Sequence, residues 1–141
     1  MITSAQVARR MEGDRLPLLT LEEFFDGNEA EDSLAPNQWG YGRPPLTEIL
    51  RRLREAEQAT DVAWVRVGLH WDTETDEENG DVCAESILIA TTAPAVDLEA
   101  RLDTESLQSD GIIESDEQSL EDYCSIPAIS GHERIVFLVW D

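Results

Sequence analysis

The sequence between Asp61 and Thr92 contains two apolar segments. They are separated by ten mostly acidic residues that include a glycine. In the first segment hydrophobic side chains recur at every second position, with one face formed by Ala63, Val65, Val67, Leu69 and Trp71 and the other by Val62, Trp64, Arg66, Gly68 and His70. Such alternation is typical of a half-buried β-strand. The second segment is apolar throughout its centre, as expected of a strand near the middle of a sheet. The stretch therefore predicts two β-strands joined by an exposed loop.

Amphipathic segments on either side of this strand pair predict helices that cover it. Thr20 and Glu23 have the spacing of a capping box, which predicts a short helix over residues 21–26. Leucine and isoleucine recur with helical spacing across residues 45–59, and the same pattern predicts a helix over residues 94–103.

Shorter elements complete the predicted fold. Residues 16–19 are extended, residues 111–113 form a strand or a buried turn, and residues 135–140 form a strand covered on both faces. A helical turn is expected over residues 118–124, with Ser115 and Gln118 as its capping pair. If the last strand runs parallel to the second, the helix between them is a right-handed crossover. The fold class is α+β: a mixed or antiparallel sheet of three to four strands with helices on one face, a two-layer sandwich.

One domain is expected from a chain of 141 residues with 41% hydrophobic and 29% charged side chains, because this balance is typical of globular proteins. We place that domain at residues 16–141, preceded by a flexible or weakly helical lead-in at residues 1–15. No apolar run approaches the roughly 20 residues that span a bilayer, and the first residues lack the pattern of a secretion signal. A cytoplasmic location follows as the expectation, with Cys83 and Cys124 as free thiols.

A net charge of −21 restricts the class of partner. Nucleic acid and anionic membranes are repelled by such a chain, whereas a basic protein is attracted. All ten basic residues are arginine, so Schiff-base and lysine-dependent phosphate chemistry are excluded. The arginine cluster of the longest predicted helix (Arg51, Arg52 and Arg54) is expected to be a solvated face paired with acidic neighbours. The alternative is that the acidity reflects the composition of the host genome and has no role in binding.

A long loop at residues 28–45 carries two aromatic residues, Trp39 and Tyr41, among glycines and prolines. Loops of this length are often functional, which makes these residues binding candidates. Because buried aromatic side chains dominate core energetics, packing of both rings onto the core is the favoured interpretation. In the alternative, the loop is a lid over a ligand pocket lined by Tyr41, Trp64 and His70.

The acidic decade, residues 72–81, contains Asp72, Glu74 and Asp76 in an alternation similar to that of calcium-binding loops. The EF-hand pattern then fails, because Glu77 occupies the glycine position and Cys83 stands at the position of the bidentate glutamate. We therefore expect a solvated hairpin loop and no dedicated metal site.

The sequence contains no recognisable catalytic or zinc-binding motif. Two cysteines and two histidines (Cys83, Cys124, His70 and His132) offer zinc ligands, yet none occurs in a CxxC or HxxxH pair. The chain also lacks G-x-S-x-G, P-loop and G-x-G-x-x-G motifs. The sequence therefore favours a protein that is not an enzyme and has no cofactor.

The segment LTLEEFFDGN, followed by SLAPN, and the final VFLVWD together resemble a family of small acidic bacterial proteins with an "LEEFFxGN…APN" start and a "WWD"-like end. The resemblance spans residues 16–141, and this chain has Val139 where others show a tryptophan. The family has no assigned activity, so the resemblance implies no catalytic residues. Size and charge are also similar to those of the immunity proteins that neutralise bacterial toxins.

The sequence predicts a non-enzymatic acidic binding protein that docks a basic protein partner, and the likeness in size and charge extends this to neutralisation of the partner in the manner of an immunity protein. The alternatives are a small ligand-binding or enzymatic domain with residues 28–45 as its lid, and an acidic domain whose charge is set by its host. Oligomeric state is left open. The predicted binding residues are Trp39, Tyr41, Trp64, His70, Asp72, Glu74 and Asp76.

Overall fold

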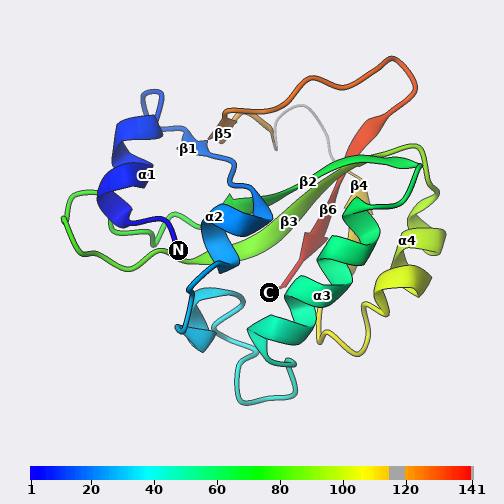
Figure 1. Ribbon diagram of the computed structural model, residues 1–141, viewed down its shortest axis with the longest axis horizontal. Helices are drawn as coiled ribbons and strands as arrows, with labels where there is room; N and C mark the ends of the chain where they lie inside the picture. Colours follow the sequence, from blue (N-terminus) through cyan, green and yellow to red (C-terminus); the bar gives the residue numbers. More distant parts are fainter. Residues whose placement is uncertain (115–119, 141) are drawn as a thin grey trace.

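A four-stranded antiparallel sheet forms the centre of the computed structural model, which describes residues 1–114 and 120–140 (Figure 1). Its strand order is β2-β3-β6-β4, with the bounds Val62–Leu69, Ala84–Thr91, Arg134–Val139 and Gly111–Glu114. β6 pairs antiparallel with β3, so the conditional right-handed crossover is not formed. The predicted strand pair is confirmed, and residues 111–113 form a strand and not a turn.

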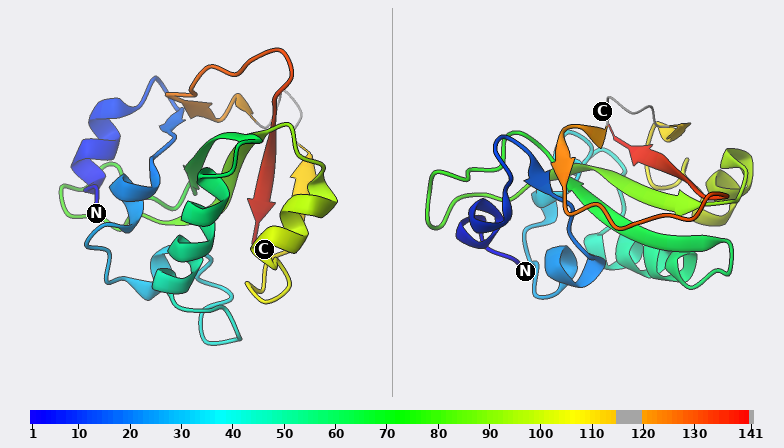
Figure 2. Two further views of the ribbon diagram at one scale, coloured as in Figure 1. Left: turned by 45° about the vertical axis from the view of Figure 1, so that its right-hand side comes forward. Right: turned by 90° about the horizontal axis from the view of Figure 1, so that it is seen from above.

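Three helices cover one face of this sheet: α2 (Leu21–Phe25), α3 (Leu46–Glu57) and α4 (Ala95–Leu102). Seen from above, α2 and α3 lie on the same side of the sheet (Figure 2, right). Their buried side chains join the main hydrophobic core with the inward-facing side chains of β2 and β3. The two-layer α+β arrangement is therefore the one that the periodicity predicts.

The other face of the sheet carries a smaller core. Strands β1 (Leu16–Pro17) and β5 (Tyr123–Cys124) pair in parallel there, and Trp64 packs beside them against the sheet. The predicted capping pair of the turn at residues 118–124 lies outside the described residues, while the end of that segment is β5. Where this second layer meets the ends of β2 and β3, the described residues leave a hollow whose lining includes Gly68, Ser86, Tyr123 and Phe137.

The first helix, α1 (Ser4–Arg10), begins with a capping box in which Thr3 and Gln6 exchange hydrogen bonds. The side chain of Val7 is fully buried in the main core, which fixes the helix against the domain. α1 lies next to the β2–β3 hairpin loop (Figure 1), so the lead-in is part of the surroundings of that loop.

The alternation along β2 is interrupted at both ends of the strand. A register irregularity between Val62 and Trp64 places Val62 in the main core and leaves Ala63 exposed, the reverse of the expected faces. A second irregularity at Leu69 ends the strand, and Trp71, expected on the core face, is 58% exposed. Hydrophobic periodicity does not reveal bulges, because a bulge changes the phase of the pattern without changing its composition.

The loop at residues 28–45 includes a 3₁₀ turn, η1 (Glu31–Ser33), and is held by Arg43, whose side chain is buried. One Arg43 nitrogen donates to the carbonyl oxygen of Leu34 at 2.7 Å, and another contacts a carboxylate oxygen of Glu31 at 3.3 Å. The guanidinium carbon lies 4.5 Å from the centre of the Trp39 ring. Burial lowers the pKa of Arg43, partly offset by Glu31.

The expectation that both aromatic residues of this loop pack onto the core is wrong. Tyr41 is 79% exposed and Trp39 is 38% exposed, because Trp39 stacks on Arg43 and Tyr41 lies at the turn beyond it. A buried arginine, and not a buried aromatic ring, anchors the loop.

We predict that Arg43→Met destabilises the protein by about 1–3 kcal/mol, because the Leu34 carbonyl loses its buried donor. Urea denaturation measures this loss, and tryptophan fluorescence reports the release of Trp39. Arg43→Lys keeps the charge but loses the planar stacking; if it restored full stability, charge alone would hold the loop.

Candidate functional site

The acidic hairpin loop, residues 72–81, is fixed to α1 by one buried hydroxyl. Ser4 Oγ contacts the carbonyl oxygens of Glu77 and Glu78 at 2.7 and 3.2 Å, and it accepts a hydrogen bond from the Gly80 N–H at 2.9 Å. Within the loop, the backbone N–H of Glu74 donates to the carbonyl oxygen of Asp81 at 2.9 Å. The loop predicted to be merely solvated is therefore held in one conformation against the first helix.

The carboxylates of this loop have no arginine partner among residues 1–114 and 120–140. Six of the ten arginines form ion pairs with carboxylates elsewhere in the chain: Arg10, Arg43, Arg51, Arg52, Arg101 and Arg134. In the loop itself, hydrogen bonding with the Glu77 carboxyl and repulsion from Glu77 and Asp81 raise the pKa of Glu74. The loop is thus a concentrated negative charge that the chain leaves uncompensated.

In the arginine cluster on α3, Arg51 and Arg52 both form ion pairs with glutamates of the same helix. Arg51 contacts Glu48 and Glu55, both at 2.6 Å, and Arg52 contacts Glu48 at 3.0 Å. These two arginines lower the pKa of Glu48 to about 2. The expectation of a solvated helix face paired with acidic neighbours describes this cluster well, so α3 offers little positive charge to an anionic partner.

An acidic hollow of about 410 Å³ lies on one side of the loop. Asp32, Asp72, Glu74 and Asp81 line it together with Cys83. Burial raises the pKa of the Cys83 thiol, and the neighbouring carboxylates act in the same direction. The thiol is therefore held in its protonated form, which is a poor nucleophile.

A second hollow, of about 280 Å³, lies where the end of β2 meets β3, β5 and β6. We call it the His70 hollow. His70 lies at its edge, with Nδ1 accepting a hydrogen bond from the Asp72 N–H at 3.1 Å and Nε2 standing 3.6 Å from a carboxylate oxygen of Glu85. At its floor the hydroxyls of Ser86 and Tyr123 are 3.4 Å apart. Burial raises the pKa of Tyr123, so its hydroxyl stays protonated.

Gly68 allows this floor to form. A Cβ atom at Gly68 would stand 2.6 Å from Ser86 Oγ and 2.9 Å from the Tyr123 hydroxyl, closer than side-chain carbons approach such groups. The absence of a side chain therefore lets the hydroxyl pair lie directly on β2.

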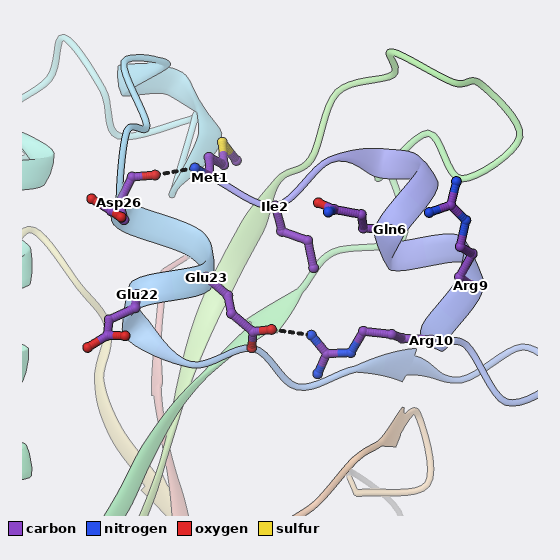
Figure 3. Close-up of a pocket in the computed structure, with 8 residues that line it drawn as sticks. All are labelled: Met1, Ile2, Gln6, Arg9, Arg10, Glu22, Glu23 and Asp26. Carbon is purple, nitrogen blue, oxygen red and sulfur yellow. Dashed lines mark hydrogen bonds and ion pairs between the residues drawn. The ribbon is translucent and has the colours of Figure 1, made fainter.

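A third hollow, of about 440 Å³, lies between α1 and α2 (Figure 3). Arg10 pairs there with Glu23 at 2.5 Å, and the amino group of Met1 donates to the Asp26 carbonyl oxygen. Ile2 points between the two helices (Figure 3). None of the predicted binding residues lines this hollow.

The structure brings four of the predicted binding residues together and separates the other three. His70, Asp72, Glu74 and Asp76 all belong to the hairpin end. Trp64 is buried in the second core, where its Nε1–H donates to the Ala128 carbonyl oxygen at 3.4 Å, while Trp39 and Tyr41 lie in the loop below α3 (Figure 1). The pocket expected to be lined by Tyr41, Trp64 and His70 is therefore not assembled, and residues 28–45 do not cover His70.

Sequence reasoning missed the residues that complete the hairpin end: Ser4, Glu85, Ser86, Asp122 and Tyr123. Two serines, a tyrosine and two of 31 acidic residues carry no local motif. Gly68, inside an otherwise regular strand, was the one available signal, since such a glycine marks a close approach.

His70 and Cys83 line separate hollows. Within the described residues, no group of three or more histidine, cysteine or carboxylate side chains is arranged to hold a metal ion. None of the helices in that same part of the chain is long and apolar enough to cross a membrane.

The sequence profile of the "Uncharacterized protein YfbO family" matches residues 2–138. The chain belongs to this family. The family resemblance inferred from the sequence thus leads to proteins described as uncharacterised, whereas the likeness to immunity proteins finds no support. No curated protein and no solved structure matches the chain.

We predict that Ser4→Ala loosens the acidic loop and costs about 1–2 kcal/mol, because the Gly80 N–H loses its acceptor. Hydrogen exchange should accelerate at residues 77–80, and urea denaturation should show the lower stability. Ser130→Ala, an exposed site, is the matched control; equal behaviour of the two variants would show that Ser4 does not hold the loop.

Glu74→Gln should raise the melting temperature near neutral pH. The folded-state pKa of Glu74 lies above its unfolded value, so ionisation at neutral pH disfavours the folded state, and this penalty is relieved as the pH falls through the folded pKa. The gain from the substitution should therefore shrink as the pH falls through the folded pKa and be lost below about pH 4, and it should also shrink at high salt. Thermal melts over this pH range measure it; a constant gain at every pH would contradict the electrostatic origin.

Proposed function

We propose that this chain is a non-enzymatic binding protein that docks a basic protein partner on its acidic hairpin loop. The observation that carries the proposal is the loop at residues 72–81, which is fixed by Ser4, lacks an arginine partner in the described part of the chain, and holds Glu74 at a raised pKa.

Repulsion between the carboxylates of a fixed loop raises the free energy of the folded protein, and a bound cation from another molecule lowers it again. A flexible acidic loop would relax its repulsion by spreading its side chains, whereas a loop held at both its backbone and its tip cannot. A basic partner would gain from charges that are already oriented, since less ordering remains to be done on binding. The net charge of −21 would also speed the encounter through long-range steering.

The partner is a basic protein of no particular class, because the family to which the chain belongs gives no support for a role as an immunity protein. The alternative with residues 28–45 as a lid is less well supported, because Arg43 fixes this loop and no residue of it lines the His70 hollow.

The test separates the loop from net charge. The loop variant carries Glu74→Gln, Asp76→Asn and Glu77→Gln; the matched control carries Glu57→Gln, Glu105→Gln and Asp110→Asn, exposed carboxylates with the same total charge change. Binding to an immobilised arginine-rich peptide is measured at low and high salt. We expect the loop variant to lose about tenfold more affinity than the control, which corresponds to about 1.4 kcal/mol, and the difference to shrink at high salt.

Equal losses in the two variants would overturn the proposal, because binding would then depend on total charge and not on the loop. That outcome would favour an acidic composition set by the host. Affinity that does not respond to salt would equally count against electrostatic docking.

A further inference from the structure

The His70 hollow combines acidic, aromatic and hydroxyl groups around one open space. Its lining includes Trp71, Glu85, Ser86, Asp122, Tyr123 and Phe137. No arginine lines it, so its two carboxylates, Glu85 and Asp122, have no arginine partner there, and the nearest basic group to Glu85 is His70, with Nε2 at 3.6 Å. A hollow of about 280 Å³ has room for a planar side-chain group but not for a large cofactor.

Two of the four tryptophans contact an arginine of this chain through their rings, whereas Trp71, which lines the hollow, has no such contact among the described residues. Arg43 stacks on Trp39, and the guanidinium carbon of Arg66 lies 5.8 Å from the centre of the Trp64 ring. Trp140 is buried, with its Nε1–H donating to the Leu107 carbonyl oxygen at 3.0 Å. Trp71 is the most exposed of the four, and no arginine in the described residues stacks on it. An exposed indole at the rim of an acidic hollow is suited to receive a cation from another molecule.

We infer that the His70 hollow binds a guanidinium group, with an arginine side chain of the basic partner as its occupant. A guanidinium is flat, stacks on aromatic rings and donates two parallel hydrogen bonds to one carboxylate. Trp71 supplies the stacking surface, Glu85 the carboxylate, and the Ser86 and Tyr123 hydroxyls the acceptors at the floor. A lysine ammonium would gain the charge but little of the stacking, because it is compact and strongly hydrated.

This inference rests on the proposed function, because the docked partner is what supplies the arginine. The hollow adjoins the acidic loop through His70 and Asp72, which are in contact. A protein seated on the loop would therefore have the hollow within reach of a side chain. The loop would supply general attraction, and the hollow a preference for arginine.

The experiment uses four small probes and the full chain labelled with ¹⁵N. N-acetyl-arginine methylamide represents an arginine in a protein, its lysine and citrulline counterparts test charge and shape, and agmatine represents a free guanidinium compound. Titrations follow the indole N–H resonances, with Trp71→Phe used to assign the signal of Trp71. We expect the arginine amide to shift the Trp71 signal and not that of Trp39, which does not line the hollow, with the lysine amide about threefold weaker and the citrulline amide without effect.

Variants then locate the site. Glu85→Gln should weaken binding of the arginine amide about fivefold and Trp71→Ala about threefold. Trp71→Phe should bind less tightly than the unaltered protein and more tightly than Trp71→Ala. Glu105→Gln, which removes one exposed carboxylate outside the hollow, should change binding little. Equal effects of Glu85→Gln and Glu105→Gln, or equal binding of the citrulline amide, would overturn the inference. Agmatine bound more than about tenfold tighter than the arginine amide would assign the hollow to a free metabolite and overturn the partner arginine.

Failure here differs from failure of the proposed function. If the loop variant binds the arginine-rich peptide as the control does, while Glu85→Gln still weakens the arginine amide, the docking loop is refuted and the guanidinium site stands. If the loop variant loses peptide binding while the hollow variants bind the amide normally, docking stands and the guanidinium site is refuted.

Discussion

Antiparallel pairing of β2 with β3 is the interaction on which the other features depend. β3 is buried on both faces and is hydrogen-bonded on both edges, to β2 and to β6. Its pairing with β2 aligns the hairpin so that the acidic loop emerges beside α1, and the two hollows adjoin this end of the hairpin. Burial of the helices against the same sheet holds the strands that carry these groups in place.

The elements with a strong local pattern were predictable from the sequence. The strand pair, the capping box at Thr20, the helix at residues 46–57 and the doubly buried last strand all follow from periodicity and capping, because each signal lies within a few residues. The bulge at Ala63, the exposure of Trp71 and the anchoring of the 28–45 loop by Arg43 were not predictable. Each depends on a contact that is distant in sequence or on a change of register that leaves the composition unaltered.

The candidate site was predictable only in part, for a related reason. Four of its residues lie at alternate positions of one short segment, so the acidic loop could be predicted as a unit: His70, Asp72, Glu74 and Asp76. Ser4 acts on this loop from more than 70 positions away, and Tyr123 reaches Ser86 from 37 positions away. With 31 acidic side chains in the chain, the acidic residues that matter cannot be distinguished by type. Geometry distinguishes them: Glu48 and Glu55 on α3 are paired with arginines, whereas the carboxylates of the loop have no arginine partner among the described residues.

The pairing of β3 with β6 has a consequence for synthesis on the ribosome. β3 reaches its second neighbour only after residues 134–139 have been made, so for some 40 residues of elongation its apolar edge is unpaired. Unpaired strand edges invite association between nascent chains. Like charges along those same chains oppose such association. The acidity of the sequence would in this way protect the unfinished sheet during translation, whatever it contributes to the completed protein.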